Sequence, residues 1–479
     1  MYYLVPFLAL SLGLLVPSAS AARGSPEKIH GVNLGNWLIA EGWMMSNEWG
    51  AMGGENCDPC GGCVRSDGAF ARFFPDDVDA KYKQHWETWF TQKDVDDLVD
   101  LGINAVRIPI GWYIIEQLVD RKTEFFPRGG LASLRRGLDQ LHKADIAVVL
   151  DLHGAPGAQR PDQAWTGNCT KVPQFYTPEN YHRALVWTAV MTTLSHIDPV
   201  FGSVFAIQAV NNPLVNATLT PGYGDYQQNF VLIMRLVEMI LGVDIKESNS
   251  KLPKLSYGET NITYAFTDAA SSSTVRNFCP KEVLGALLDA RVIVEDIVQD
   301  LIRNNTCLEI PAHINTEPLI ANFMDVTAQN FTGPNAAEIA IGPTSFDHHL
   351  FFADDGSGNV SATQEGYLRA ICQLPLHDTL VHYRNAPYWL GEWTLTTQLG
   401  SGETDAFLKD YADAQKIAYN DSLGWFYWNF KTESPGTWSY IDGVKKGWLT
   451  KDPAAVHNPH VCDKYWDELP WCEDEDGKH

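Results

Sequence analysis

Positive charge is scarce in this chain of 479 residues. It has 35 Lys and Arg against 59 Asp and Glu, which gives a formal net charge of −24 at pH 7. A nucleic acid or an anionic membrane surface is attracted by positive charge, so we expect neither as a partner. Aromatic residues, by contrast, are plentiful. The 16 tryptophans suit a neutral ligand such as a polysaccharide, because sugar rings stack on indole, although most tryptophans in any protein serve the core.

Long apolar runs are also scarce. The strongest one lies in the opening MYYLVPFLALSLGLLVPSASAA, is too short for a membrane span, and ends in small residues that fit a cleavage site. We therefore expect residues 1–21 to be a signal peptide. The protein would be secreted, extracellular or in the cell wall, without a membrane span. Seven Asn-x-Ser/Thr sequons agree with this route and predict a glycoprotein, at Asn168, Asn216, Asn261, Asn304, Asn330, Asn359 and Asn420.

Nine cysteines follow the expected signal peptide: Cys57, Cys60, Cys63, Cys169, Cys279, Cys307, Cys372, Cys462 and Cys472. In an oxidising compartment most should form disulfides, and the odd number leaves one thiol free or paired between chains. The spacing Cys57-x-x-Cys60-x-x-Cys63 is compatible with a metal site but has no nearby His. We expect no metal and no cofactor, and the sequence leaves the connectivity open.

Segments typical of strands and of helices alternate from residue 29 onward, which predicts an α/β protein with a parallel sheet. The expected strands are 29–38, 103–112, 146–154, 204–210, 307–315, a segment ending at 352, 387–393 and 424–430. Helical spacing of apolar residues lies between them. Eight such units predict a (β/α)8 TIM barrel with loop insertions. We expect one domain over 22–479, with an insertion at about 243–305, and a monomer.

Functional side chains gather where the expected strands end. They are Arg107, His153, Asn211, His349, Glu392 and Trp428. Any one of them alone could be a structural group. Active sites of (β/α)8 barrels lie at the carboxyl ends of the strands, so six such residues at six strand ends predict one shared site.

The chain resembles glycoside hydrolase family 5 and, within it, the fungal exo-1,3-β-glucanases. The resemblance covers most of the chain after residue 21. It rests on five blocks: GVNLGNWLIAEGWM (31–44), VRIPIGW (106–112), DLHGAPGAQ (151–159), LGEW (390–393) and GWFYWNFKTESPGTWSY (424–440). It implies a retaining glycosidase with Glu392 as nucleophile. It also implies a sugar-binding set of Glu41, Arg107, His153, Asn211, His349 and Trp428.

Two positions depart from the family's pattern. Asn212, in Asn-Asn-Pro, stands where the family has its acid/base Glu, and Phe351 stands where it has a Tyr that supports the nucleophile. Retaining glycosidases need two carboxyl groups roughly 5–5.5 Å apart. An amide neither donates nor accepts a proton at neutral pH, and positioned acid–base catalysis is worth on the order of 10²–10⁴ in rate.

The paired loss predicts a pseudoenzyme: a secreted β-glucan-binding protein that is inactive or very slow on natural glycosides. The alternative is an active retaining exo-1,3-β-glucosidase with a displaced acid/base. Glu317, which follows the expected fifth strand, is the candidate for that role. A third possibility is an interaction or wall-structural protein without sugar affinity. The retained sugar-binding residues count against it.

Overall fold

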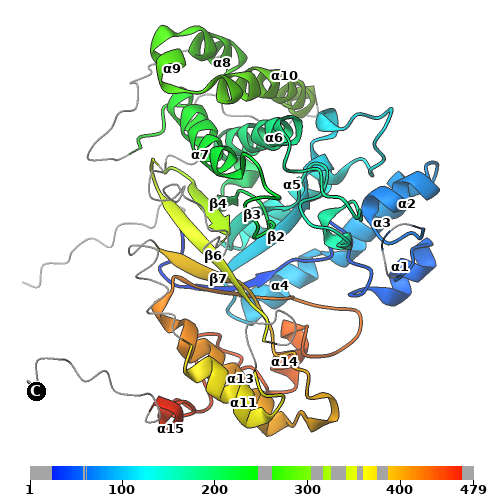
Figure 1. The fold of residues 1–479 in the computed structure, drawn as a ribbon, viewed down its shortest axis with the longest axis vertical. Helices are drawn as coiled ribbons and strands as arrows, with labels where there is room; N and C mark the ends of the chain where they lie inside the picture. Colours follow the sequence, from blue (N-terminus) through cyan, green and yellow to red (C-terminus); the bar gives the residue numbers. More distant parts are fainter. Residues whose placement is uncertain are drawn as a thin grey trace, which may run out of the picture.

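The computed structural model describes residues 24–57, 60, 62–245, 262–303, 317–324, 341–352, 360–374 and 387–466. Within them, eight parallel strands close into a barrel in which each strand pairs with its neighbours in sequence and β8 pairs with β1 (Figure 1). The strands are β1 (Ile29–Asn33), β2 (Ala105–Gly111), β3 (Ala147–Gly154), β4 (Val204–Gln208), β5 (Ile320–Met324), β6 (Thr344–Leu350), β7 (Tyr388–Trp393) and β8 (Gly424–Tyr427). The predicted (β/α)8 TIM barrel is confirmed.

The fifth strand is the one that the sequence prediction misplaced. β5 pairs with β4 through Ala206 and Ile320 and with β6 through Met324 and Asp347. The segment 307–315, expected to be this strand, lies outside the described residues. Both segments are short and apolar, and length and hydrophobicity do not separate them. The shift matters because Glu317 comes before β5 and not after it.

Helices surround the barrel, as eight buried parallel strands require. They are α1 (Ser46–Met52), α2 (Asp67–Phe73), α3 (Val78–Trp89), α4 (Gln92–Asp100), α5 (Gly130–Lys143), α6 (Pro178–Ile197), α7 (Tyr223–Ile240), α8 (Ile262–Ser271), α9 (Ser273–Phe278), α10 (Lys281–Arg303), α11 (Gln364–Cys372), α13 (Asp405–Ala418), α14 (Tyr440–Lys445) and α15 (Asp463–Trp466). None of the helices in the described ranges combines the length and apolar character that a membrane crossing needs.

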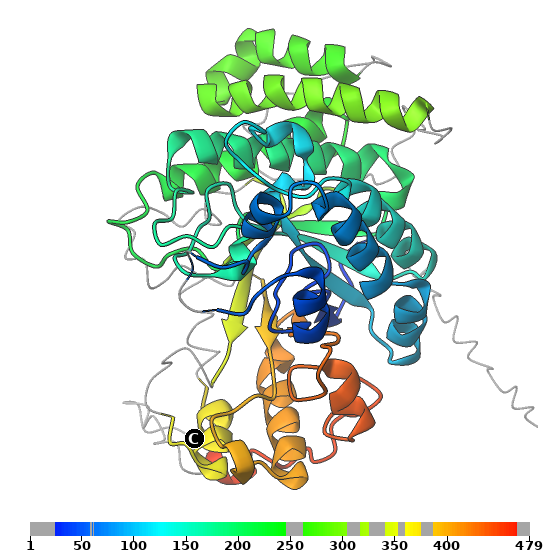
Figure 2. The same cartoon turned by 90° about the vertical axis from the view of Figure 1, so that its right-hand side faces the viewer.

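One group of helices adds a layer outside the barrel. α10 packs against α6 and α7, and α8 packs against α10. In Figures 1 and 2 these light-green helices lie beyond the helices that cover the strands. They fall within the insertion expected at about 243–305, whose status as an insertion stays a prediction.

The interior of the barrel has an apolar layer and a polar layer. Side chains alternate along a strand, so every second residue points inward. The apolar layer is a cluster of buried residues that comprises Ile29, Ala105, Val149, Trp389, Phe426 and, on β4 where the register with β3 is irregular, both Phe205 and Ala206. Two residues further along β2 and β3, toward the carboxyl ends, the buried side chains are Arg107 and Asp151. The sequence thus turns polar at the end of the barrel where active sites form.

Three disulfides tie loops together. They join Cys57 to Cys63, Cys60 to Cys169, and Cys372 to Cys462. Cys279 is a buried thiol. Cys307 and Cys472 lie outside the described residues. The Cys60–Cys169 bond links the loop after α1 to the loop after β3, two segments that also flank the pocket described next.

Candidate active site

A pocket of about 550 Å³ opens at the carboxyl ends of the strands. Most of the site residues predicted from the sequence line it, namely Glu41, His153, Asn211, Asn212, His349, Phe351, Glu392 and Trp428. Arg107 does not line the pocket; it is fully buried and hydrogen-bonds residues that do. The structure therefore brings together all of these residues, while their individual roles stay predictions.

Arg107, on β2, contacts several other residues of the polar layer. Its guanidinium donates to Glu392 Oε1 and to Asn211 Oδ1, each at 2.9 Å. It also lies 3.0 Å from Asp151 Oδ2 and 3.7 Å from Asp347 Oδ2. A planar guanidinium can serve several oxygens at once in fixed directions. It therefore orients both the carboxylate at the nucleophile position and the amide beside it.

Glu392, on β7, is buried within this cluster. Burial raises its pKa well above the usual range; Arg107 lowers it, and the carboxylates of Asp151 and Asp347 raise it further. Its Oε2 lies 3.3 Å from His349 Nδ1, without the geometry of a hydrogen bond. Burial also lowers the pKa of His349, which favours the neutral imidazole. Burial, together with the excess of carboxyl groups over the single guanidinium, thus favours the protonated form of Glu392 more than water would.

His153, on β3, is oriented by its neighbour on the same strand. Its Nδ1 lies 2.6 Å from Asp151 Oδ2, so Nδ1 carries the proton and Nε2 is left as an acceptor. Nε2 lies 3.5 Å from Asn211 Nδ2 and 4.0 Å from Glu41 Oε1. The ring stacks on Trp428, with centroids 5.6 Å apart and planes 7° apart. Three other predicted sugar-binding residues therefore lie around the His153 ring.

Glu41 lies in the loop after β1 and is also buried. Its Oε2 accepts from Trp43 Nε1 at 3.0 Å, while Oε1 accepts no hydrogen bond from the described residues. Burial raises its pKa to about 8. At neutral pH the carboxyl is mostly protonated, so it can either donate to or accept from a sugar hydroxyl.

The two positions that depart from the family's pattern face this same pocket. Asn212 has a φ of +41°, in the left-handed region that Asn tolerates better than most residues. Phe351 packs against Trp438, with ring centroids 5.9 Å apart, and has no hydroxyl to offer Glu392. Among the described residues that line the pocket, Glu41 and Glu392 are the only carboxylic acids. The acid/base position holds none.

Glu317 does not belong to this site. It is exposed and lies three residues before β5 begins at Ile320. The five residues of β5 span about 16 Å at 3.3 Å per residue, and the pocket lies at the far end. The prediction of Glu317 as a displaced acid/base is therefore wrong, because the strand it was thought to follow is one that it precedes.

The sequence did not single out six further residues that line the pocket. They are Trp43, Arg65, Arg160, Gln163, Trp165 and Trp438. Trp43 is 44% exposed and meets Trp438 edge-on, with centroids 5.1 Å apart. Both lie inside the sequence blocks that carry the family resemblance. This position in the blocks is the feature of the sequence that could have identified them as pocket residues. Residues in loops lack the regular alternation of a strand, so the sequence does not tell which way their side chains point.

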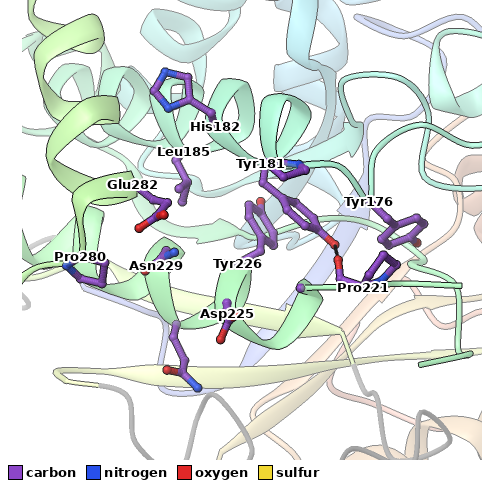
Figure 3. Close-up of a pocket in the computed structure, with 13 residues that line it drawn as sticks. Tyr176, Tyr181, His182, Leu185, Pro221, Asp225, Tyr226, Asn229, Pro280 and Glu282 are labelled. Atoms are coloured by element: carbon purple, nitrogen blue, oxygen red, sulfur yellow. Dashed lines mark hydrogen bonds between the residues drawn. The ribbon is translucent and has the colours of Figure 1, made fainter. Parts of the chain in front are cut away.

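A second cavity of similar volume, about 560 Å³, lies in the helical wall between α6, α7 and the start of α10 (Figure 3). Tyr176, Tyr181 and Tyr226 line it, and the Tyr181 hydroxyl donates to Pro221 O at 2.9 Å. No arginine is among the described residues that line it, and its two carboxylic acids, Asp225 and Glu282, are exposed. Among the described residues that line it, the cavity has no buried carboxylic acid and no buried arginine, and we do not consider it a candidate for catalysis.

Comparisons with known proteins agree with this geometry. The family model described as cellulase (glycosyl hydrolase family 5) matches residues 76–196. Glucan endo-1,6-beta-glucosidase B of Emericella nidulans is 27% identical over 463 residues, which cover 93% of this chain and 91% of that protein. Glucan 1,3-beta-glucosidase of Blumeria graminis is 24% identical over 456 residues, covering 91% and 90%.

A solved structure is similar in fold. The rutinosidase from Aspergillus niger superposes with a TM-score of 0.53 and 15% identity, over 88% of this chain and 97% of that one. At this identity the likeness shows the barrel and says nothing of the ligand.

Proposed function

The chain belongs to glycoside hydrolase family 5, and we propose that it is a secreted β-glucan-binding protein with an impaired catalytic site. One observation carries this proposal. The pocket keeps the carboxyl at the nucleophile position, Glu392, together with the sugar-binding set, whereas an amide, Asn212, stands at the acid/base position. A site with this composition can hold a sugar but lacks the proton transfer that cuts it.

The binding half of the proposal rests on the contacts around His153. Its Nε2, the Asn211 amide and the Glu41 carboxyl offer an acceptor, a donor and a group that does both. Trp428 lines the same pocket and offers an aromatic surface. A pyranose with several equatorial hydroxyls matches such a set. The relatives from Emericella nidulans and Blumeria graminis are named for 1,6- and 1,3-β-glucans, which supports a β-glucan as the ligand.

The impaired half rests on what surrounds Asn212. A glucan leaves as an alkoxide unless an acid protonates it. The charged group that contacts Asn212 among the described residues is the Arg160 guanidinium, which donates to the Asn212 carbonyl at 2.9 Å. Arginine does not release its proton at physiological pH. Glu41 is held by Trp43 beside His153. No carboxyl group lining the pocket, within the part of the chain that is described, takes the place of the missing acid.

The extracellular location is supported by the three disulfides, since such bonds persist in oxidising compartments. The signal peptide expected at residues 1–21 is part of this proposal. So is a monomeric state.

Calorimetric titration with 1,3- and 1,6-linked β-gluco-oligosaccharides tests the proposal, with glucose release followed in the same samples. We expect saturable binding without release. Trp428→Ala should abolish the binding, whereas Asp225→Asn in the second cavity should leave it unchanged. Absence of binding to either series would favour an interaction protein without sugar affinity. Release at rates typical of glycosidases, lost in Glu392→Gln, would overturn the impairment.

A further inference from the structure

Arg160 lies against the backbone of the position that has lost its acid. It follows β3 in the loop that leads to α6. Its Nε donates to Asn212 O at 2.9 Å, and its Nη2 donates to Pro213 O at 3.2 Å. The side chain is partly buried and lines the same pocket as Glu392.

No carboxylate among the described residues forms an ion pair with Arg160. Its guanidinium bonds neutral carbonyls, and within the described ranges the one group that favours its charged form is the Tyr176 hydroxyl. A second guanidinium, that of Arg65, also lines the pocket. Arg160 therefore places a positive charge at this wall of the pocket, in a protein whose net charge is −24.

A cation and a general acid help different leaving groups. An acid gives a proton to a basic oxygen such as a sugar alkoxide. A guanidinium keeps its proton but stabilises negative charge that develops beside it, through charge-assisted hydrogen bonds in a partly desolvated site. The pair Asn212 and Arg160 therefore suits a leaving group that departs as a stable anion and needs no proton.

We propose that this pocket accepts glucosides whose leaving group is a weakly basic oxyanion, an aryl oxide or a carboxylate, with Arg160 facing that anion. The inference rests on the proposed function, because it uses the same sugar pocket, and it names a substrate class for it. Arg160 acts on the departing oxygen, and Glu392 acts on the sugar.

The first step is balanced without an acid. The ionised carboxylate of Glu392 attacks the anomeric carbon and forms a glucosyl ester. The bond from that carbon to the leaving oxygen breaks, and its electron pair leaves with the oxygen as an anion beside Arg160. No proton is transferred, so Asn212 is no obstacle.

In the second step, water and a small anion attack the glucosyl ester at different rates. Water must lose a proton as it attacks the ester, and Asn212 cannot accept it, so hydrolysis is slow. A small anion such as azide has no proton to lose. It displaces the Glu392 carboxylate and yields a β-glucosyl azide with the configuration retained after two inversions.

The test uses 2,4-dinitrophenyl β-glucoside and methyl β-glucoside, each with and without azide. With the aryl glucoside we expect a burst of one equivalent of dinitrophenolate, then slow turnover that azide accelerates at least tenfold, with β-glucosyl azide as product. Methyl β-glucoside should give no product. Absence of both burst and azide product, in a preparation that binds gluco-oligosaccharides, overturns this inference and leaves the proposed function intact. If oligosaccharide binding is also absent, the proposed function fails with it.

The role of Arg160 is tested in Arg160→Gln and Arg160→Lys. We expect Arg160→Gln to slow the burst roughly 10²-fold, as removal of one oxyanion donor does, and Arg160→Lys to recover part of the loss. Arg128→Gln, an exposed arginine far from the pocket, is the matched control. Across aryl glucosides of graded acidity, the rate in Arg160→Gln should fall more steeply as the leaving group becomes more basic. An equal loss for every leaving group indicates a structural role and overturns the assignment.

Discussion

Two cavities of nearly equal volume, about 550 and 560 Å³, differ in almost everything except size. The pocket at the barrel mouth is built on strand ends, and buried ionisable groups surround it. The cavity in the helical wall is built on helix surfaces, with tyrosines and exposed polar groups (Figure 3). Volume therefore does not identify the functional site of this protein. The chemistry of the walls does.

The difference has an energetic side. Burying Arg107 with Asp151, Asp347 and Glu392 removes four ionisable groups from water, which is unfavourable unless each is paired. Among the described residues that line the helical-wall cavity, the carboxylic acids Asp225 and Glu282 are exposed, so lining that cavity costs no comparable desolvation. This arrangement supports the proposal that the barrel mouth is a ligand site, with Asn212 at the acid/base position.

The largest effect that we expect from a single substitution is a fall in the free energy of unfolding when the buried charge cluster at the barrel mouth is broken. Arg107→Met leaves three buried carboxyl groups without their cation, and we expect it to lower the free energy of unfolding by about 3–5 kcal/mol. Asn229→Ala in the helical-wall cavity should change it by no more than about 0.5 kcal/mol. Urea unfolding measures both. If both variants lost a similar free energy of unfolding, the two cavities would not differ in how much their lining contributes to stability.

The next effect is a pH dependence that belongs to the barrel mouth. The pKa of Glu41 is raised from 4.5 to about 8, so its contribution to stability is fully present below about pH 4.5 and is lost as the pH rises through about 8. Over that window each pH unit changes the free energy of unfolding by at most about 1.4 kcal/mol.

Glu41→Gln should flatten the fall in stability between about pH 4.5 and 8, as urea unfolding at several pH values would reveal. Asp67, whose pKa is raised to about 6, contributes a background that the variant retains. The matched variant Asp225→Asn, in the second cavity, should leave the slope as in the wild type. An unchanged slope in Glu41→Gln would contradict the protonated state assigned to Glu41.

A smaller effect concerns ligand affinity. Trp43 is exposed at the rim and meets Trp438, so its removal takes away aromatic surface without opening the core. We expect Trp43→Ala to raise the Kd for a β-gluco-oligosaccharide roughly tenfold, which corresponds to about 1.4 kcal/mol. Calorimetric titration measures it. A Kd equal to that of the wild type would place the sugar away from this rim.

The smallest expected effect is a loss of stability without a loss of glucan affinity, caused by a substitution in the second cavity. Tyr181→Phe removes the hydrogen bond to Pro221 O and should lower stability by about 1 kcal/mol. Glucan affinity should not change. If affinity falls as well, the helical-wall cavity is a second glucan site. Both cavities would then bind glucan, and they would differ only in how strongly they do so.

Much of the fold could be predicted because the strands carry a strong local signal. Buried runs such as Ala105–Gly111 and Ala147–Gly154 are mostly apolar, and each contains a predicted site residue, Arg107 or His153. The fifth strand could not be placed, since Ile320–Met324 is short and contains the polar Asn322, whose amide bonds within the barrel. Its true pairing depends on contacts with strands distant in sequence.

The site was predictable to the extent that strand periodicity controls it. Arg107 and His153 could be found because they continue the inward-facing alternation of β2 and β3. Arg160 could not, since it lies in a loop and its direction is set by the carbonyls of Asn212 and Pro213. Glu317 was misassigned for the same reason as the fifth strand. Tertiary contacts decide such positions.

The central claim is that the missing acid at position 212 is the main catalytic defect of the barrel mouth. It is tested most directly by comparing wild type with Asn212→Glu on polymeric 1,3- and 1,6-β-glucans, with reducing ends measured across pH. We predict no hydrolysis by the wild type and a gain of about 10²–10⁴ in rate for Asn212→Glu, lost again when Glu392→Gln is added. Efficient hydrolysis by the wild type, abolished by Glu392→Gln alone, would contradict the account.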